Sequence, residues 1–289
     1  MLRSAAPSER FVAWPDREPA DALVVLPDDW TEVADALTPE VRWVHVLAAG
    51  VDKFPLDRAG DRIVTCSRGA SAPAIAEFVL ATVLAFEKQL PDVWVQEPPE
   101  HWNLAGLGGV RGKTLGLVGV GAIGTEVARR ALAFDMEVLA LRRTAATLPL
   151  PEMERVESLP ELLGRSDHVV VAAPSTPETH HLLDAGALAA VKPGVHLVNI
   201  ARGALVDQDA LRVALDDGRI ARASLDVVDP EPLPAGHWLY AHTKVRLSPH
   251  ISWSSPGTIE RTVDLFADNL RRWRDGRSLH GVVDVAAGY

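Results

Sequence analysis

Three short segments in the second half of the sequence carry side chains suited to acid-base chemistry on an acidic ketone. Arg202 lies in an Asn-Ile-Ala-Arg-Gly run, Glu231 lies between two prolines, and His250 follows Ser-Pro. A ketone beside a carboxylate needs a guanidinium to hold the anion, a proton for the developing alkoxide, and a carboxylate that keeps the proton donor charged. Arg202, His250 and Glu231 can fill these roles in that order, which predicts hydride transfer to a 2-oxo acid.

A glycine-rich loop upstream of these segments predicts a dinucleotide site. It follows the apolar run 115–118 and opens a helical pattern. Its first glycine permits a tight turn, its second lets backbone approach a pyrophosphate, and its third allows close helix-strand packing. A tight strand-helix turn without a ligand is the alternative. The loop consists of Gly119, Val120, Gly121, Ala122, Ile123 and Gly124.

Arginines occupy the place, about twenty residues further on, where an acidic side chain normally binds the adenosine ribose. Arg142 directly follows an apolar run, with Arg143 and Thr144 behind it. A carboxylate there would repel a 2′-phosphate, whereas two guanidiniums would bind it. The predicted cofactor is therefore NADP(H), with NAD(H) possible. Solvated loop arginines, or an arginine stacked on adenine, are the alternatives.

Taken in order, these motifs resemble the D-isomer-specific 2-hydroxyacid dehydrogenases, the family of phosphoglycerate, glycerate and D-lactate dehydrogenases and of glyoxylate/hydroxypyruvate reductases. The likeness covers about residues 43–274, and several motifs in the right order are far more specific than a lone G-x-G-x-x-G. The segments that carry it are 48–52, 111–116, 119–124, 199–203, 225–227, 230–232 and 248–250.

The resemblance implies further site residues. The backbone N–H groups of Ala49, Gly50 and Val51 would hold the substrate carboxylate together with Arg202, while His250 exchanges the proton. Ala173, Pro174 and Thr179 belong to a loop that would border the nicotinamide and pyrophosphate, and Asp226 would contact the carboxamide. The cofactor-binding residues implied beyond the glycine loop and the arginines are Ala173, Pro174, Thr179, Ile200, Ala201, Arg202, Asp226, His250 and Ser252.

Structural alternatives exist for several of these residues. Arg202 could pair with Asp207, Glu231 could be an ordinary loop carboxylate, and Asp226 could cap the turn that follows it. Trp253, where relatives often carry small residues, could line the substrate pocket or point outward as packing. An indole in the pocket would favour small or flat substrates such as glyoxylate or hydroxypyruvate.

Composition narrows the possible partners and location. A net charge of −10 and a pI near 5.5 argue against nucleic acid and anionic membranes as partners. No stretch is long enough for a membrane span and the N-terminus lacks the apolar core of a signal peptide, so we expect a cytoplasmic protein. Cys66 is the single cysteine and lacks a nearby base, and no metal-ligand spacing occurs. An excess of Arg (24) over Lys (5) suggests a GC-rich bacterial genome.

Apolar runs that alternate with helical patterns from residue 114 onward indicate a parallel sheet covered on both faces. We therefore expect an α/β protein with a doubly wound Rossmann nucleotide domain and a smaller flavodoxin-like α/β substrate domain. The substrate domain, 1–101 and 252–289, would be discontinuous around the nucleotide domain, 102–251. The strands expected in the nucleotide domain are 115–118, 137–141, 168–173, 195–200, 221–227 and 245–247.

The leading interpretation is an NADP(H)-preferring enzyme that reversibly reduces a small 2-oxo acid to the D-2-hydroxy acid. In the resembled family, a helix such as that expected over 72–90, with the proline-broken stretch to Trp102, builds a homodimer contact. The alternative is a nucleotide-sensing scaffold like the C-terminal-binding corepressors, which resemble these dehydrogenases and keep the same three residues.

Overall fold

The computed structural model describes every residue except 14, 17, 27–32 and 104–105, and it divides into two compact units. The first unit joins Met1–Ala72 with Ser254–Tyr289, and the second is Pro73–Trp253. The first unit is discontinuous in the sequence, and residues 73–101, expected in the substrate domain, group with the second unit. The reason is the long helix α3 (Ala72–Glu87), whose apolar residues lie in a core cluster of the second unit.

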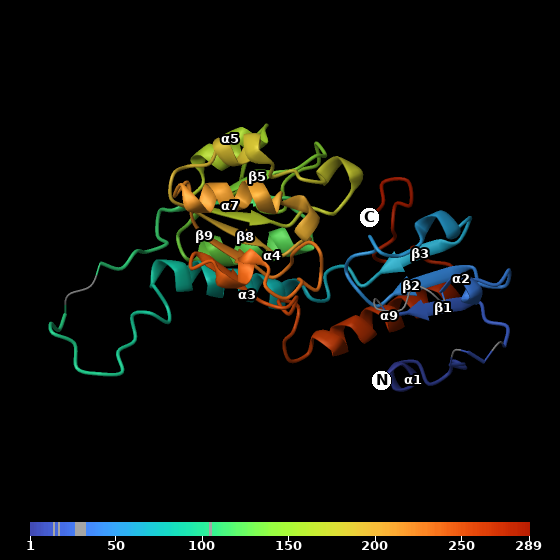
Figure 1. The fold of residues 1–289 in the computed structure, drawn as a ribbon. Helices are drawn as coiled ribbons and strands as arrows, with labels where there is room; N and C mark the ends of the chain where they lie inside the picture. Colours follow the sequence, from blue (N-terminus) through green and yellow to red (C-terminus); the bar gives the residue numbers. More distant parts are fainter. Residues whose placement is uncertain (14, 17, 27–32, 104–105) are drawn as a thin grey trace. The chain divides into compact units, whose positions relative to one another are not determined.

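A seven-stranded parallel sheet forms the centre of the second unit, in the order β10-β9-β8-β7-β4-β5-β6 (Figure 1). The direction of the order reverses between β4 and β7, and open sheets of this kind bind ligands at the carboxyl ends of the strands beside such a switch. All six expected strands are present, and the short β6 is an addition. The strands are β4 (Thr114–Val118), β5 (Glu137–Leu141), β6 (Glu154–Arg155), β7 (His168–Val171), β8 (Val195–Asn199), β9 (Ile220–Leu225) and β10 (Val245–Leu247).

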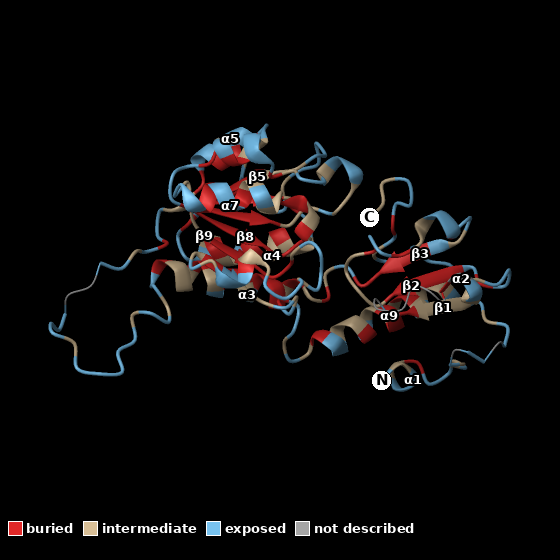
Figure 2. Cartoon of the chain, in the orientation of Figure 1, coloured by how far each residue is buried: buried red, intermediate tan, exposed pale blue. Residues whose placement is uncertain are grey.

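Helices cover both faces of this sheet, which is why its central strands are buried along their whole length (Figure 2). On α4 the buried residues Gly124, Val127, Ala128 and Ala131 recur at helical spacing and face the sheet. One apolar cluster contains residues of α3 and α4, and the other contains residues of the remaining longer helices. These helices are α4 (Ala122–Ala133), α5 (Leu159–Arg165), α6 (Ala185–Ala189) and α7 (Gln208–Asp216), followed by the short α8 (Trp238–Ala241).

The first unit has, in its described part, a three-stranded parallel sheet in the order β1-β2-β3. An antiparallel bridge between Thr65 and Val282 adds the C-terminal tail beside β3. Trp43 stacks on Phe266 and Trp273 of α9, with ring centroids 5.7 Å apart in both pairs, so aromatic contacts hold this helix on the sheet. The elements are β1 (Ala22–Val25), β2 (Trp43–Val46), β3 (Ile63–Cys66), α1 (Leu2–Ala5), α2 (Val33–Ala36) and α9 (Thr258–Arg274).

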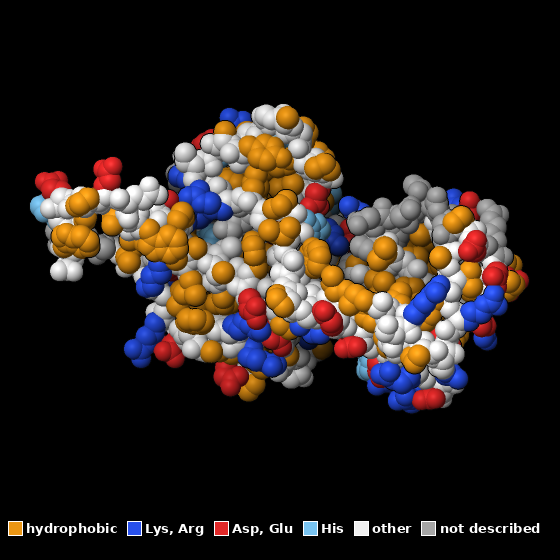
Figure 3. All heavy atoms as spheres, turned by 90° about the horizontal axis from the view of Figure 1, so that it is seen from below, with side chains coloured by type: hydrophobic (Ala, Val, Ile, Leu, Met, Phe, Trp, Pro, Cys, Tyr) orange, Lys and Arg blue, Asp and Glu red, His pale blue; other side chains and the backbone are white. Residues whose placement is uncertain are grey.

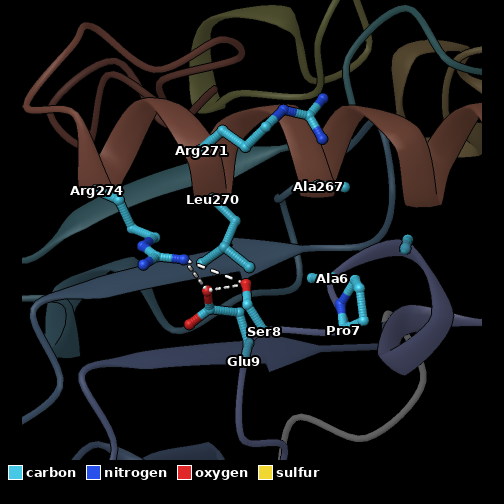
Figure 4. A pocket seen from close by; sticks show the side chains of 9 residues that line it. Ala6, Pro7, Ser8, Glu9, Ala267, Leu270, Arg271 and Arg274 are labelled. Atoms are coloured by element: carbon cyan, nitrogen blue, oxygen red, sulfur yellow. Dashed lines mark hydrogen bonds and ion pairs between the residues drawn. The ribbon is translucent and has the colours of Figure 1, made fainter.

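A shallow cavity of about 200 Å³ lies between the N-terminal segment and α9 (Figure 4). Arg274 forms an ion pair with Glu9 there and donates a hydrogen bond of 3.2 Å to the Ser8 hydroxyl. None of the lining residues is a predicted site residue. The contact therefore attaches the N-terminus to α9.

Residues 88–103 and 106–113, between α3 and β4, include apolar side chains in contact with solvent (Figure 3). Trp94 and Trp102 are 71% and 72% exposed, and Val95 and Leu107 are also exposed. Apolar exposure on this scale marks a surface that other molecules can cover. No helix in the described ranges is long and apolar enough to cross a membrane.

His45 is a buried structural histidine in the first unit. Its Nδ1 lies 2.7 Å from Thr65 Oγ1 and its Nε2 lies 3.1 Å from Ser67 Oγ, while Trp43 Nε1 donates to the same threonine hydroxyl. Burial lowers the pKa of His45 to about 4, because the charged ring would lose its hydration. The folded protein therefore keeps this ring neutral at pH values where the unfolded chain protonates it.

We expect acid to destabilise the first unit through this group. The unfolded ring titrates near 6.5 and the folded ring near 4, so its contribution is complete above about pH 6.5 and is lost as the pH falls toward 4. Between these pH values the free energy of unfolding should fall by about 3 kcal/mol through this group. Urea unfolding followed by tryptophan fluorescence at several pH values should show a flatter pH dependence for His45→Leu. The control His101→Leu, which replaces an exposed ring, should keep the parent's slope; equal slopes for His45→Leu and the parent would contradict the prediction.

Candidate active site

The glycine loop after β4 has the shape of a dinucleotide cradle. Gly119 has φ +98°, and a Cβ there would lie 2.7 Å from the backbone nitrogen of Ala173. A Cβ on Gly124 would lie 2.7 Å from the carbonyl oxygen of Gly119, so protein packing alone requires both glycines. A Cβ on Gly121 would meet no atom within 4 Å. Its lack of a side chain therefore leaves open space at the N-terminus of α4, where the helix can receive a phosphate.

Arg142 lies beside this loop, because the carbonyl of Leu141 at the end of β5 accepts a hydrogen bond of 3.0 Å from Gly119 N–H. The guanidinium of Arg142 donates a hydrogen bond to the carbonyl of Thr147, 3.3 Å away. Arg143 is close enough to Glu178 to help lower the pKa of that carboxyl, although a hydrogen bond from Thr176 is the larger cause. Arg142 therefore lies next to the glycine loop, and binding of the adenosine ribose end by the two arginines stays a prediction.

The loop after β7 borders the other side of the switch point. Ala172 N–H donates to the Val118 carbonyl at the end of β4, which carries Ala173 and Pro174 past the glycine loop. Thr179, at the end of a single 3₁₀ turn (η2, Pro177–Thr179), uses its hydroxyl within the loop by donating to the Pro174 carbonyl at 2.8 Å. The hydroxyl thus shapes the loop that was expected to border the nicotinamide.

Arg202 is held in a turn at the end of β8 by Asn199, which is 1% exposed. The Asn199 side chain donates to the carbonyl of Arg202 at 2.9 Å and accepts from Ala201 N–H at 3.0 Å. The Arg202 guanidinium donates to the Ala201 carbonyl at 2.7 Å. Asp207 caps α7 by accepting from the backbone N–H groups of Asp209 and Ala210.

Gly203 brings the arginine turn against the segment that carries the acidic residue. It begins the 3₁₀ turn η3 (Gly203–Leu205), and a Cβ there would lie 1.9 Å from the carbonyl carbon of Val228. The Gln208 side chain bonds both the N–H and the carbonyl of Asp229, two residues before Glu231. Only a glycine permits so close an approach, so the chain forces these two loops together.

His250 and Glu231 form a direct pair: His250 Nδ1 lies 2.9 Å from Glu231 Oε1. The histidine side chain is 39% exposed and the glutamate side chain 28% exposed. Because an ionised carboxylate only accepts hydrogen bonds, the contact places a hydrogen on Nδ1 and leaves Nε2 for proton exchange. The pair can therefore act as an oriented acid and base.

The carboxylate of Asp226 lies directly after β9 and binds the loop that contains His250. It accepts hydrogen bonds from the Ser248 hydroxyl at 2.5 Å and from the N–H groups of Ile251 and Ser252 at 2.9 Å. Asp226 is 1% exposed, so a buried carboxylate anchors this loop to the end of β9. Contact with the cofactor carboxamide remains a prediction.

One further expected segment belongs to the first unit. Ala49, Gly50 and Val51 follow β2 in the first unit, and their backbone N–H groups donate to no group among the described residues. Three free amide donors in a row suit a carboxylate. Cys66 is fully buried on β3, and burial raises the pKa of its thiol, so it cannot serve as an accessible nucleophile. No group of three or more metal-ligating side chains occurs in the described ranges.

Comparison with known proteins identifies the family. The model of the D-isomer specific 2-hydroxyacid dehydrogenase NAD-binding domain matches residues 80–252. The chain belongs to this family. It is 36% identical to a glyoxylate reductase of Thermofilum pendens over 263 residues, covering 86% of this chain and 77% of that protein. It is 33% identical to a D-3-phosphoglycerate dehydrogenase of Mycobacterium bovis over 96% of this chain but only 55% of that protein.

A solved structure extends the likeness over the whole chain. The D-isomer specific 2-hydroxyacid dehydrogenase of Xanthobacter autotrophicus Py2, in complex with NADPH and MES, is 29% identical, with a TM-score of 0.84 and coverage of 100% of this chain and 94% of that one. The NAD-binding domain predicted from the glycine loop is thus confirmed as the family's nucleotide domain. The residues of the glycine loop fit a dinucleotide, because the open space at Gly121 lies at the N-terminus of α4.

The sequence motifs indicate Arg202, Glu231 and His250 as reactive side chains but not the residues that support their loops. Asn199 and Gly203 stand in the arginine motif without an assigned role, and Gln208 lies outside every motif. A polar residue that directly follows apolar residues at the end of a buried strand, as Asn199 follows Leu197 and Val198, is a signal that can identify the first of them.

We predict that Gly121→Ala weakens dinucleotide binding without destabilising the fold. The new methyl group would meet no protein atom but would occupy the space where a pyrophosphate approaches, so affinity should fall by about tenfold or more. Calorimetric titration with NADPH and NADH gives the affinity, and thermal unfolding without ligand gives the stability.

The matched variant Gly119→Ala should behave in the opposite way, losing stability because its Cβ would collide with the backbone near Ala173. Unchanged affinity in Gly121→Ala would mean that this glycine does not border the cofactor.

Proposed function

We propose that the protein uses NADPH to reduce a small 2-oxo acid, such as glyoxylate or hydroxypyruvate, to the D-2-hydroxy acid. The observation that carries the proposal is the 2.9 Å contact between His250 and Glu231, on loops that follow the strands of an NAD-binding domain. The glyoxylate reductases among its relatives support the substrate class. We also expect a cytoplasmic homodimer.

In the mechanism, each residue has a separate task. Reduced nicotinamide, when bound, supplies the hydride. The guanidinium of Arg202 holds the substrate carboxylate and polarises the ketone, because its planar donors match two oxygens at once. His250 donates a proton from Nε2 to the oxygen that gains negative charge, and Glu231 on Nδ1 stabilises the imidazolium and fixes the ring. In the oxidative direction His250 accepts the proton.

The cofactor preference rests on Arg142 and Arg143. Rossmann domains bind the adenosine ribose through an acidic acceptor near the end of the second strand, but in this chain two arginines follow β5. Of the two, Arg142 follows the strand directly and lies beside the glycine loop, whereas Arg143 already has Glu178 nearby. We therefore assign the larger share of 2′-phosphate recognition to Arg142.

The proposed reaction is tested by screening NADPH and NADH oxidation against a panel of 2-oxo acids, with His250→Gln as the key variant. The variant should lose on the order of 10²-fold or more in kcat while its affinity for the dinucleotide is retained, because the proton donor acts chiefly in the transition state. Dinucleotide binding without turnover of any 2-oxo acid by the parent would favour the scaffold alternative. Near-normal turnover in a folded His250→Gln would remove this residue from the mechanism.

A separate prediction concerns the choice of cofactor. If the arginines bind the 2′-phosphate, kcat/KM should favour NADPH over NADH by on the order of 10²-fold, and added salt should reduce the ratio. Arg142→Asp should invert the preference, because a carboxylate accepts from the ribose and repels the phosphate. Arg155→Asp offers a control, since Arg155 bonds carbonyls further along the same loop. A parent that prefers NADH would show that the arginines do not select the cofactor.

A further inference from the structure

The proton donor lies in a backbone conformation that the surrounding structure has to impose. His250 has φ +55°, in the left-handed region that residues with a Cβ seldom adopt. Such a conformation is strained and persists only where neighbouring groups fix it. The contacts on both sides of His250 therefore decide where its imidazole lies.

Asp226 fixes one side of this residue. The N–H of His250 donates to the carbonyl of Asp226 at 2.9 Å and lies 3.0 Å from the carbonyl of Ser248. The next two N–H groups, of Ile251 and Ser252, donate to the Asp226 carboxylate. Every one of these bonds restrains an amide N–H, and none holds the carbonyl of His250.

Trp253 supplies the missing restraint. Its indole Nε1–H donates to the carbonyl oxygen of His250 at 3.0 Å, which closes a turn from residue 250 to residue 253. Trp253 is 42% exposed, so part of its ring lies on the loop while the rest contacts solvent. The indole N–H thus gives the loop a directed contact that a ring of similar size without a donor would not supply.

We infer that Trp253 is a positioning residue that holds His250 against Glu231 by bonding the carbonyl of His250. The inference rests on the proposed function and gives Trp253 a role other than that of a pocket wall. The peptide group after His250 is fixed at its oxygen by Trp253 and at its nitrogen by Asp226, so its plane cannot rotate. Loss of the indole donor frees one end and loosens the 2.9 Å contact between the imidazole and Glu231. A small displacement of a proton donor is costly, because proton transfer depends on close alignment.

The test is Trp253→Phe, which keeps an aromatic ring and removes the donor. With glyoxylate or the best small 2-oxo acid of the panel, kcat should fall about tenfold, while KM and NADPH affinity stay within about twofold. The control Trp238→Phe removes an indole whose N–H donates no hydrogen bond among the described residues, and it should leave these quantities unchanged.

A readout independent of turnover separates this inference from the proposed function. The Nδ1–H proton signal of His250, assigned by its absence in His250→Gln, should be sharp in the parent and broadened by exchange with water in Trp253→Phe, because its hydrogen bond to Glu231 is loosened. An unchanged signal overturns the inference even if the protein reduces 2-oxo acids, and a broadened signal supports it even if no substrate is found.

Other kinetic outcomes also overturn it. A changed KM or a wider substrate range with unchanged kcat would make the indole a pocket wall, and no change at all would make it packing. If Trp253→Phe fails to fold, replacement of Trp253 by benzothienylalanine, which has the shape of tryptophan with sulfur in place of N–H, carries the same measurements.

Discussion

The buried carboxylate of Asp226 determines the arrangement of the catalytic loop. A carboxylate with 1% exposure requires hydrogen-bond donors, because burying a charge without them costs several kcal/mol. The donors come from residues 248, 251 and 252, so the chain must curl around Asp226 on both sides of His250. The left-handed backbone of His250 follows from this curl. The direction of the imidazole, and with it the pairing to Glu231, thus depends on an interaction beneath the site.

At two glycines the backbone passes very close to another loop, and each contact joins the loops that follow two neighbouring strands of the sheet. Gly119 places the loop after β4 against the loop after β7, and Gly203 places the loop after β8 against the segment after β9. At both positions a Cβ would lie under 3 Å from backbone atoms, which cannot move aside as a flexible side chain can. Arg202 and Glu231 therefore sit on loops fixed by main-chain contact. Gly121 differs, because its missing side chain leaves room that no protein atom fills, and this contrast separates a glycine needed for packing from one needed for a ligand.

Much of the nucleotide domain could be predicted from the sequence, because strands buried on both faces are apolar runs with sharp ends. The fold class and the family are confirmed, and the ends of β5 and β10 agree with prediction to the residue. The unit in which α3 packs is harder to predict from the sequence. The spacing of apolar residues in a helix shows that one side is buried, but not against which core. The support given by Asp226 is hidden for a similar reason: the sequence shows an acidic residue at the end of a strand, but not the three donors that converge on it from 22 to 26 residues further along the chain.

The roles of the histidines also depend on neighbours that the sequence does not show, because the groups around each ring determine whether it can be charged. His45 faces two hydroxyl groups in a closed core, and burial keeps it neutral. His196 is buried near His168 and Ser224, and burial likewise lowers the pKa of His196. If the ring of His45 or His196 gained a proton, no carboxylate of the described residues would be close enough to offset the loss of hydration. His250 instead keeps part of its ring open to solvent and has a carboxylate on Nδ1, so it can gain and release a proton without disrupting the fold. Partial exposure and a carboxylate partner are thus what distinguish a ring suited to proton transfer from a ring that fills a core.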